Sequence, residues 1–520
     1  MTTINELLPE IYPIIAAHLP LYATPSTLLA LALTSHHISQ FALPLLYSRL
    51  VLQNETDAIL VLQKLLDHPP LGRIVRELHI LSDLSVDTRS QDPPRDVIRR
   101  VEDLVSKGHL PFIHTLGLHL MERWYYDADK DFEPVRGFGQ LRPEFLTQLK
   151  EKCPRLRGLV LKGFSDKQDE PWLEKSGFLQ VPDITSLTLR FVGSTLQQSG
   201  SDKLLAHISS LASSLHTLDL MPSSSDFASP LPVFELDLPF LRSLSLASFT
   251  EVDAVQATAF FERHPSIEYL NLASNLVGTN DRWFASDLPS EFLPNLRHLR
   301  AHWNDVRLLA PILDRLHSLS INNSVNAQIP YLLRSVLSNG LPNLKSLDIG
   351  QAASSSNKNK NIEGSLWYES QNGTFHTAKS KKESRTVFDN FMHSIVRGAP
   401  NVEELGFHGA LFQLSEFVAV SDDLNGFPRL KHLYYEEYYA SLGALTEEER
   451  NTFASQAQDL AQAVPGLVSI TNVDTTNLPY LTARISRREN GEVAGTVVGK
   501  GYGMKIGYDD EAFPWAPHNI

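Results

Sequence analysis

Three groups of residues in this sequence have types and spacings that could support chemistry. Cys153 is the single cysteine and could act as a nucleophile. The segment from Asp127 to Asp131, which has an aspartate at every second position, imitates the start of a calcium-binding loop. The segment from Gly495 to Gly501 resembles a phosphate-binding loop. We therefore consider a nucleophile, a calcium site and a phosphate site in turn.

Cys153 has a simpler explanation than catalysis. It stands directly before Pro154, in a position that is apolar before most comparable prolines of the chain. Free cysteine behaves as a small apolar residue in protein cores. The sequence therefore predicts that Cys153 is part of the core.

The two loop-like segments each lack a residue that their chemistry needs. A calcium loop requires glycine at its sixth position, where this chain has Phe132. The segment at Gly495 has three spacer residues where a phosphate loop has four. Asn490-Gly491 instead predicts a hairpin turn, so Gly495 to Gly501 fits one strand of a β-ribbon. We expect no catalytic residue, no metal site, no cofactor and no enzymatic activity.

Polar and aromatic residues inside short apolar segments are better candidates for a functional site. Their types indicate protein binding and not catalysis. One cluster lies between residues 269 and 302, and a tyrosine–glutamate run occupies 434–439. Tyrosine and arginine are enriched where proteins bind each other tightly. An alternative for the tyrosines is packing beneath a C-terminal ribbon. The predicted binding residues are Tyr269, His298, Arg300, His302, Tyr434 and Glu436.

The elements that would position these residues follow a repeated pattern. Each copy has a helical run, a proline and a short strand of the form P-x-[LIV]-x-x-L-x-L. Neighbouring copies between Ile184 and Leu344 are 20 to 31 residues apart. The L-x-L alternation predicts a strand with Leu244 facing a core and Ser245 facing the opposite side. Clear copies begin at Pro154, Pro182, Pro239, Pro265 and Pro342.

This pattern resembles leucine-rich repeats, from about Leu71 to Asn472. The resemblance implies an α/β fold in which one strand and one helix per repeat stack into a curved solenoid. A polar, low-complexity insertion at about 351–385 interrupts the repeats, and we expect it to be a mobile excursion. We assign 70–477 to the solenoid and 478–520 to a β-ribbon cap.

Composition narrows the classes of partner. The 520 residues include 46 basic and 60 acidic ones, a net charge of −14 that disfavours binding to nucleic acid or to anionic membranes. No stretch is long and apolar enough to predict a membrane span, and the first residues lack the basic start of a secretory signal. With one cysteine no internal disulfide is possible. We expect a cytoplasmic or nuclear protein.

Residues 1–52 have a different, helical pattern. Leu8-Pro9-Glu10-Ile11 opens a first helix, whose interior Pro13 predicts that the helix begins near that residue. A second helix follows Thr27, and a third ends in the phrase from Pro44 to Leu50 (P-L-L-Y-S-R-L).

This segment resembles an F-box of the fungal type, followed here by leucine-rich repeats. The resemblance implies the substrate-recognition subunit of an SCF-type ubiquitin ligase. Its F-box would bind an Skp-type adaptor, and through it a cullin, while the repeats bind an unknown target protein. An alternative is that residues 7–50 are only a helical cap on a leucine-rich-repeat scaffold that is not coupled to ubiquitination. The resemblance places the adaptor contacts at Leu8, Pro9, Ile11, Leu28, Leu29 and Leu31.

Overall fold

The computed structural model divides the chain into two compact units, residues 1–241 and 242–520. It describes residues 8–18, 24–52, 55–80, 95–119, 141–142, 144–164, 181, 183–191, 198–221, 233–247, 252–272, 282–286, 288–324, 329, 332–333, 337, 340–351, 367–369, 375–377, 391–408, 413–436, 446–473 and 480–501.

Three helices begin the first unit: α1 (Ile11–His18), α2 (Thr24–Thr34) and α3 (His36–Ser48). The helix α1 begins at Ile11, midway between Pro9 and Pro13, so Pro13 is in its first turn, where no intrahelical N–H bond is lost. Ser35 caps α3, because its hydroxyl accepts the backbone N–H of Ile38 at 3.1 Å. Tyr12, Ala32, Ile38 and Ala42 form a small core between the helices.

Six parallel strands follow in the first unit, in the order of the sequence. Their register aligns one leucine per strand across the sheet: Leu50, Leu78, Leu116, Leu159, Leu187 and Leu218. The strands are β1 (Arg49–Leu52), β2 (Glu77–Ile80), β3 (Thr115–His119), β4 (Gly158–Phe164), β5 (Ser186–Phe191) and β6 (Thr217–Met221).

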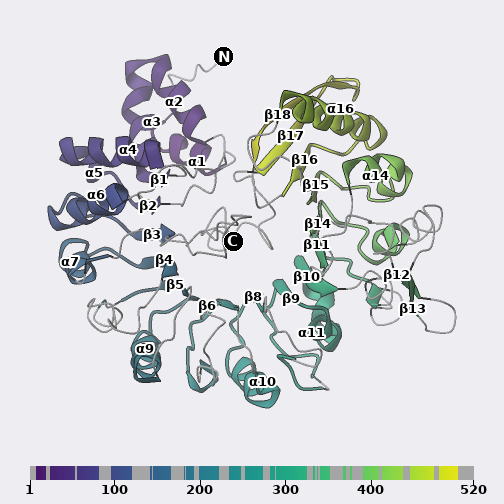
Figure 1. The fold of residues 1–520 in the computed structure, drawn as a ribbon, viewed down its shortest axis with the longest axis horizontal. Helices are drawn as coiled ribbons and strands as arrows, with labels where there is room; N and C mark the ends of the chain where they lie inside the picture. Colours follow the sequence, from purple (N-terminus) through teal and green to yellow (C-terminus); the bar gives the residue numbers. More distant parts are fainter. Residues whose placement is uncertain are drawn as a thin grey trace, which may run out of the picture. The chain divides into compact units, whose positions relative to one another are not determined.

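Helices of the first unit lie along one face of this sheet (Figure 1). We call this the helical face and the opposite one the inner face. The helices are α4 (Glu55–Asp67), α5 (Pro69–Gly72), α6 (Arg95–Ser106), α7 (Phe145–Lys152) and α9 (Gln198–Ser210), with a 3-10 turn η3 (Val233–Glu235).

The second unit continues the same alternation. Eight of its strands are parallel, and the last two are antiparallel. They are β7 (Ser243–Leu246), β8 (Tyr269–Asn271), β9 (His298–His302), β10 (Ser318–Ser324), β11 (Ser346–Gln351), β14 (Glu404–His408), β15 (His432–Tyr435), β16 (Ser469–Asn472), β17 (Tyr480–Arg487) and β18 (Val493–Gly501).

Helices again lie along one face of the second unit's sheet (Figure 1). Asn295, Asn343 and Asn401, each placed after a proline, donate side-chain hydrogen bonds to backbone carbonyls of the preceding repeat at 2.8–3.0 Å. The proline turns therefore also tie neighbouring copies together. The helical elements are α10 (Ala254–Arg263), α11 (Trp303–Leu308), η4 (Ala310–Arg315), α14 (Leu414–Ala419), α15 (Ser421–Leu424) and α16 (Glu447–Ala463).

The predicted C-terminal ribbon is formed by β17 and β18, and Gly491 takes the positive φ of its turn. Arg487 in β17 donates to the carbonyls of Ala461, Val464 and Leu467 at 2.8–3.3 Å, around the end of α16. A cation stabilises the carbonyl end of a helix. The ribbon is thus anchored to the last helix as well as to β16.

The structure confirms the α/β fold class and the predicted alternation of strands and helices along the chain. Leu244 is fully buried, and Cys153 is 2 % exposed, within the core as expected. The predicted insertion at 351–385 lies mostly outside the described residues. Within it the structure describes one antiparallel pair, β12 (Trp367–Glu369) and β13 (Phe375–Thr377). The calcium-like segment from Asp127 to Asp131 also lies outside the described residues.

Candidate functional site

The N-terminal helices leave apolar side chains at the surface. Leu8 is 67 % exposed, Leu29 46 % and Leu33 79 %, although the helices have a core of their own. Leu29 and Leu33 are four residues apart on α2, so their side chains share one face of that helix. Leu43 on α3 is also exposed, at 40 %, so we call Leu8, Leu29, Leu33 and Leu43 the exposed leucines of the helical module.

The predicted adaptor contacts fall into three classes of burial. Pro9 is exposed, like Leu8 and Leu29, while Ile11 and Leu31 are half-buried. Leu28 is 2 % exposed and packs inside the module, so it contributes no surface there. The physical reason is that α2 must turn one side toward the core around Ala32, and Leu28 lies four residues before Ala32 on that side.

Leu33 was not among the predicted contacts. The sequence places Leu33 four residues after Leu29, which indicates that both lie on one face of a helix. Which leucines of α2 are buried is decided by the packing of α2 against α3. The sequence alone therefore could not rank Leu28 below Leu33 as a surface residue.

A second candidate surface is the inner face of the sheet in the second unit. Tyr269 and His298 are register partners on β8 and β9, with ring centroids 6.3 Å apart. His298 also shares a hydrogen bond with Ser318 on β10, Nδ1 to Oγ, at 3.1 Å. Tyr269 is 5 % exposed and His298 is half-buried. The structure therefore brings these two predicted residues together, with His298 as the more accessible one.

Arg300 and His302 continue along β9 and are half-buried. His302 stabilises local structure, because its Nδ1 accepts the backbone N–H of Asn304 at 3.2 Å and caps α11. Burial lowers the pKa of His302, and this favours the neutral ring that can accept a hydrogen bond. Of the predicted cluster, His298 and Arg300 remain the residues that are both accessible and without a capping role.

Tyr434 and Glu436 lie at a different place on the sheet from the residues of β8 and β9. They are 8 % and 7 % exposed, and three strands (β10, β11 and β14) lie between β9 and β15. At a strand spacing of about 4.8 Å, this places the two predicted clusters roughly 19 Å apart. The structure does not bring them together. Residues 437–439 lie outside the described residues.

Polar side chains of the inner face bond from strand to strand, which we did not predict. Ser320 donates to Asp348 at 2.6 Å, Ser346 donates to Glu404, and His432 Nδ1 lies 2.8 Å from Ser469 Oγ. Hydrogen-bonded polar groups can be buried at low cost. Ser320 and Asp348 occupy the intervening positions of their strands and have no exposed surface, because they bond to each other.

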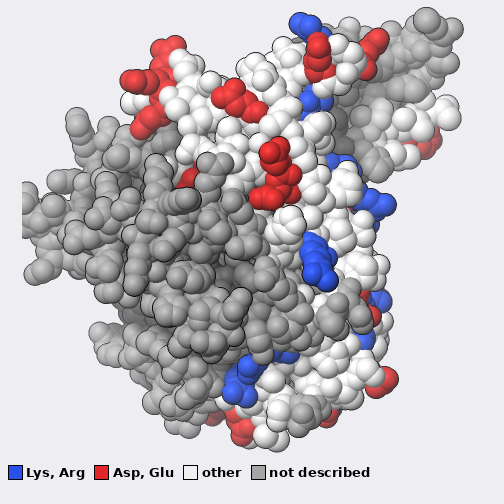
Figure 2. Space-filling model, turned by 90° about the vertical axis from the view of Figure 1, so that its right-hand side faces the viewer, with Lys and Arg blue, Asp and Glu red and all other residues white. Residues whose placement is uncertain are grey.

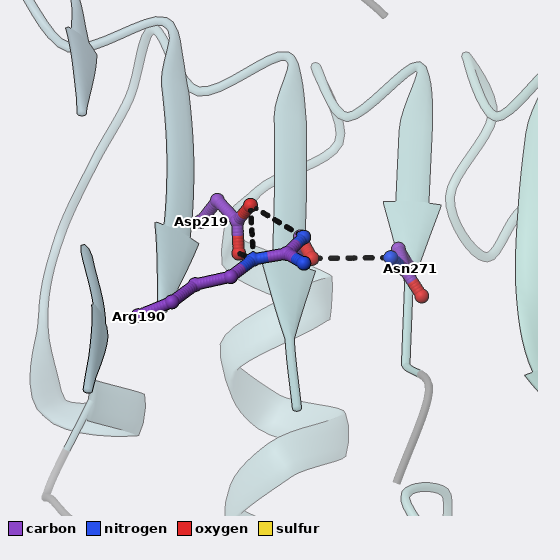
Figure 3. Close-up of polar contacts among 4 residues, drawn as sticks. Arg190, Asp219 and Asn271 are labelled. Atoms are coloured by element: carbon purple, nitrogen blue, oxygen red, sulfur yellow. Dashed lines mark hydrogen bonds and ion pairs between the residues drawn. The ribbon is translucent and has the colours of Figure 1, made fainter. Parts of the chain in front are cut away.

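Figure 3 shows two further polar contacts, one in each unit. In the first unit, Arg190 on β5 forms an ion pair with Asp219 on β6, with Nη2 to Oδ2 at 2.8 Å. In the second unit, Asn271 donates to Ser245 at 3.1 Å, and both are buried. Ser245 is therefore on the predicted face but is 6 % exposed.

Asp305 is an ionisable group buried on the helical side of β9. Its Oδ1 accepts the backbone N–H of Trp283 at 2.8 Å, and its Oδ2 has no hydrogen-bond partner among the described residues. Burial raises the pKa of Asp305 to about 7, against the opposing effect of the backbone hydrogen bonds and of Arg282. Near neutral pH this carboxyl is therefore divided between its protonated and ionised forms.

The structure bears on the cysteine and on metal binding. Burial raises the pKa of the Cys153 thiol to about 12, so the reactive thiolate is not formed near neutral pH. No cluster of histidine, cysteine, aspartate and glutamate in the described part of the chain could hold a metal ion. A membrane-crossing helix is likewise not found among the described helices.

Comparison with known proteins adds no relative. No protein-family model matches the chain, and no curated protein matches it by sequence.

Proposed function

We propose that this chain is the substrate-recognition subunit of an SCF-type ubiquitin ligase. The N-terminal helical module would be an F-box that docks an Skp-type adaptor. The remaining strands and helices would be a curved leucine-rich-repeat solenoid, closed by its β-ribbon, that binds the target protein. Ubiquitin transfer would take place on other subunits, in the cytoplasm or nucleus.

One observation supports the proposal most directly: the N-terminal helices have a small core of their own and yet keep leucines at the surface. A helix that only capped the sheet would turn its apolar side toward the sheet. Here Leu29 and Leu33 share a face of α2 that remains exposed, whereas Ala32 faces the core of the module. Apolar side chains gathered at a surface indicate a binding partner that covers them.

The repeated strands support the solenoid part of the proposal. From β7 to β10 each strand contributes one leucine to the aligned row, and neighbouring copies bond through their proline turns. One strand and one helix cannot enclose a core alone, but stacked copies can. An array of this kind offers a long inner face, on which His298 and Arg300 are accessible.

The test of adaptor binding is co-purification of the tagged chain from cells, with the Skp-type adaptor and cullin as readouts. We expect Leu29→Asp combined with Leu33→Asp to abolish adaptor recovery without unfolding the chain. Leu60→Asp is the matched control, because Leu60 on α4 is 64 % exposed but lies outside the module. Leu28 is unsuitable because its burial would confound binding with folding.

Two results would contradict the proposal. One is failure of the wild-type chain to recover the adaptor, and the other is recovery by the double variant equal to that of wild type. Either result would favour the alternative, a leucine-rich-repeat scaffold that is not coupled to ubiquitination.

A further inference from the structure

Three basic residues lie at one edge of the sheet in the first unit. By edge we mean the side of the sheet at which its parallel strands begin. Arg76, His114 and Arg157 each precede a strand, namely β2, β3 and β4. The backbone N–H of His114 donates to the Arg76 carbonyl at 2.6 Å, and that of Arg157 donates to the His114 carbonyl at 2.8 Å. These residues are therefore on successive rungs, about 4.8 Å apart.

An aromatic ring holds two guanidinium groups at this edge. The Cζ of Arg76 is 5.2 Å from the ring centroid of Phe112, and the Cζ of Arg155 is 4.7 Å from it. Both distances fit cation–π contacts. The two guanidinium carbons are thus at most about 10 Å apart, and their positions are restrained without a carboxylate.

The arginines of this edge form no ion pair with a described carboxylate. Among the described residues no carboxylate lies within 4 Å of Arg76, Arg155 or Arg157; the neighbouring Glu77 is paired with Arg49 at 2.9 Å. The pKa of His114 is lowered, first by partial burial and then by the charges of Arg76, Arg155 and Arg157, while the charge of Glu77 acts in the opposite direction. The part of the lowering that comes from the arginines is the effect expected of nearby like charges.

The corresponding edge of the second unit contains its own counter-ions. Arg242 faces Glu268 at 3.7 Å, and Lys431 contacts Glu403 at 2.7 Å. Glu403 also lies on the rung next to Lys345, because its N–H donates to the Lys345 carbonyl. On the described part of the side shown in Figure 2, both signs of charge occur and most of the surface carries neither.

We propose that the edge formed by Arg76, Phe112, His114, Arg155 and Arg157 binds an extended acidic segment of a partner protein. In an extended chain, side chains two residues apart lie about 6.7 Å apart on one side. Aspartate or glutamate at alternate positions can therefore meet two guanidinium groups that are no more than about 10 Å apart. Charge-assisted bonds from arginine to carboxylate give such a contact both strength and direction.

A protein segment fits this edge better than a nucleic acid. Nucleic-acid binding draws on a long run of phosphate contacts, usually on a basic protein. This chain has a net charge of −14, and the basic edge is confined to neighbouring rungs. The proposal goes beyond the ligase function and does not depend on adaptor binding.

The test uses the purified full-length chain and fluorescence anisotropy. The probe is a labelled peptide in which glutamate alternates with serine. We expect Arg155→Glu to weaken binding about tenfold or more. Lys345→Glu is the matched control, since it makes the same change in net charge at an exposed position on the same edge of the other unit. It should change binding by less than about twofold. Arg157→Glu, also exposed, should reproduce the effect of Arg155→Glu.

Several results would overturn the proposal. One is equal weakening by Arg155→Glu and Lys345→Glu, which would reflect net charge alone. Another is no binding of the glutamate peptide, or equal binding of the same peptide with glutamine in place of glutamate. Single-stranded DNA of the same charge binding as tightly as the peptide would assign the edge to nucleic acid. Circular dichroism melts of each variant separate a loss of binding from a loss of folding.

Discussion

The N-terminal helices and the strand–helix copies use leucine in opposite ways. In the strands, Leu244, Leu270 and Leu299 are fully buried in one aligned row. In α2, Leu29 and Leu33 lie at the surface even though the helix contributes to a core. The difference is that the aligned leucines of these strands are buried within the chain, whereas Leu29 and Leu33 of the helical module lie at its surface.

The largest expected effect tests this contrast directly. Leu244→Ala removes a fully buried side chain and leaves a cavity, so we expect the free energy of unfolding to fall by about 2–5 kcal/mol. Leu33→Ala shortens a side chain that is 79 % exposed and should change it by less than about 0.5 kcal/mol. Urea denaturation of both variants measures the difference, and comparable losses would break the comparison.

The second effect concerns a buried carboxyl group in the strand–helix copies. The pKa of Asp305 is about 7 in the folded chain, against 3.8 for an unperturbed aspartate. Between these pH values the folded state keeps a proton that the unfolded state has lost, so stability falls as pH rises and levels off above about 7. The free energy of unfolding of the wild-type chain should decline by on the order of 1–4 kcal/mol over this pH range. We expect Asp305→Asn to remove this decline. Denaturation at pH 5 to 8 tests this, and parallel curves for both proteins would contradict it.

A third effect tests whether the inner face of the first unit is also closely packed. Gly117 and His79 are register partners, and a Cβ at Gly117 would lie 2.2 Å from His79 Nδ1. His79 is 1 % exposed, so its ring has little room to move. Gly117→Ala should destabilise the chain by about 1–3 kcal/mol through overpacking. Gly495→Ala is the control, because the nearest atom there is 3.8 Å away. Equal melting temperatures for both variants would mean that the inner face is loosely packed.

The smallest effect concerns Ser245 on the inner face. It accepts a hydrogen bond from Asn271, and both side chains are buried, so Ser245→Ala should cost about 1 kcal/mol. Ser209→Ala, at an exposed position of α9, should have no measurable effect. The same denaturation curves decide this, and no difference between the two serines would mean that the hydrogen bond from Asn271 to Ser245 does not stabilise the fold.

The sequence predicted the structure well where residues of one type recur at a regular spacing. The L-x-L alternation identified the strands around Leu244, and the repeated position of Cys153 before a proline placed it in the core. Partners across strands were not predictable, because Ser320 and Asp348 are 28 residues apart and carry no local signal. Residues before the strands, such as Arg76 and Arg157, were overlooked because they stand outside the alternating positions. The capping role of His302 depends on where α11 begins, which the pattern did not fix.

The reversal of strand direction at β17 has a consequence for self-association. A parallel ladder with an open edge is a template on which another chain's strands can add. In the described sheet, β17 runs against β16, and β18, which carries Gly495, Gly499 and Lys500, forms the outer edge. Glycine in a strand weakens pairing. We therefore expect the last two strands to hinder the addition of another chain's strand at this end of the second unit, a hazard that every additional parallel repeat would otherwise renew.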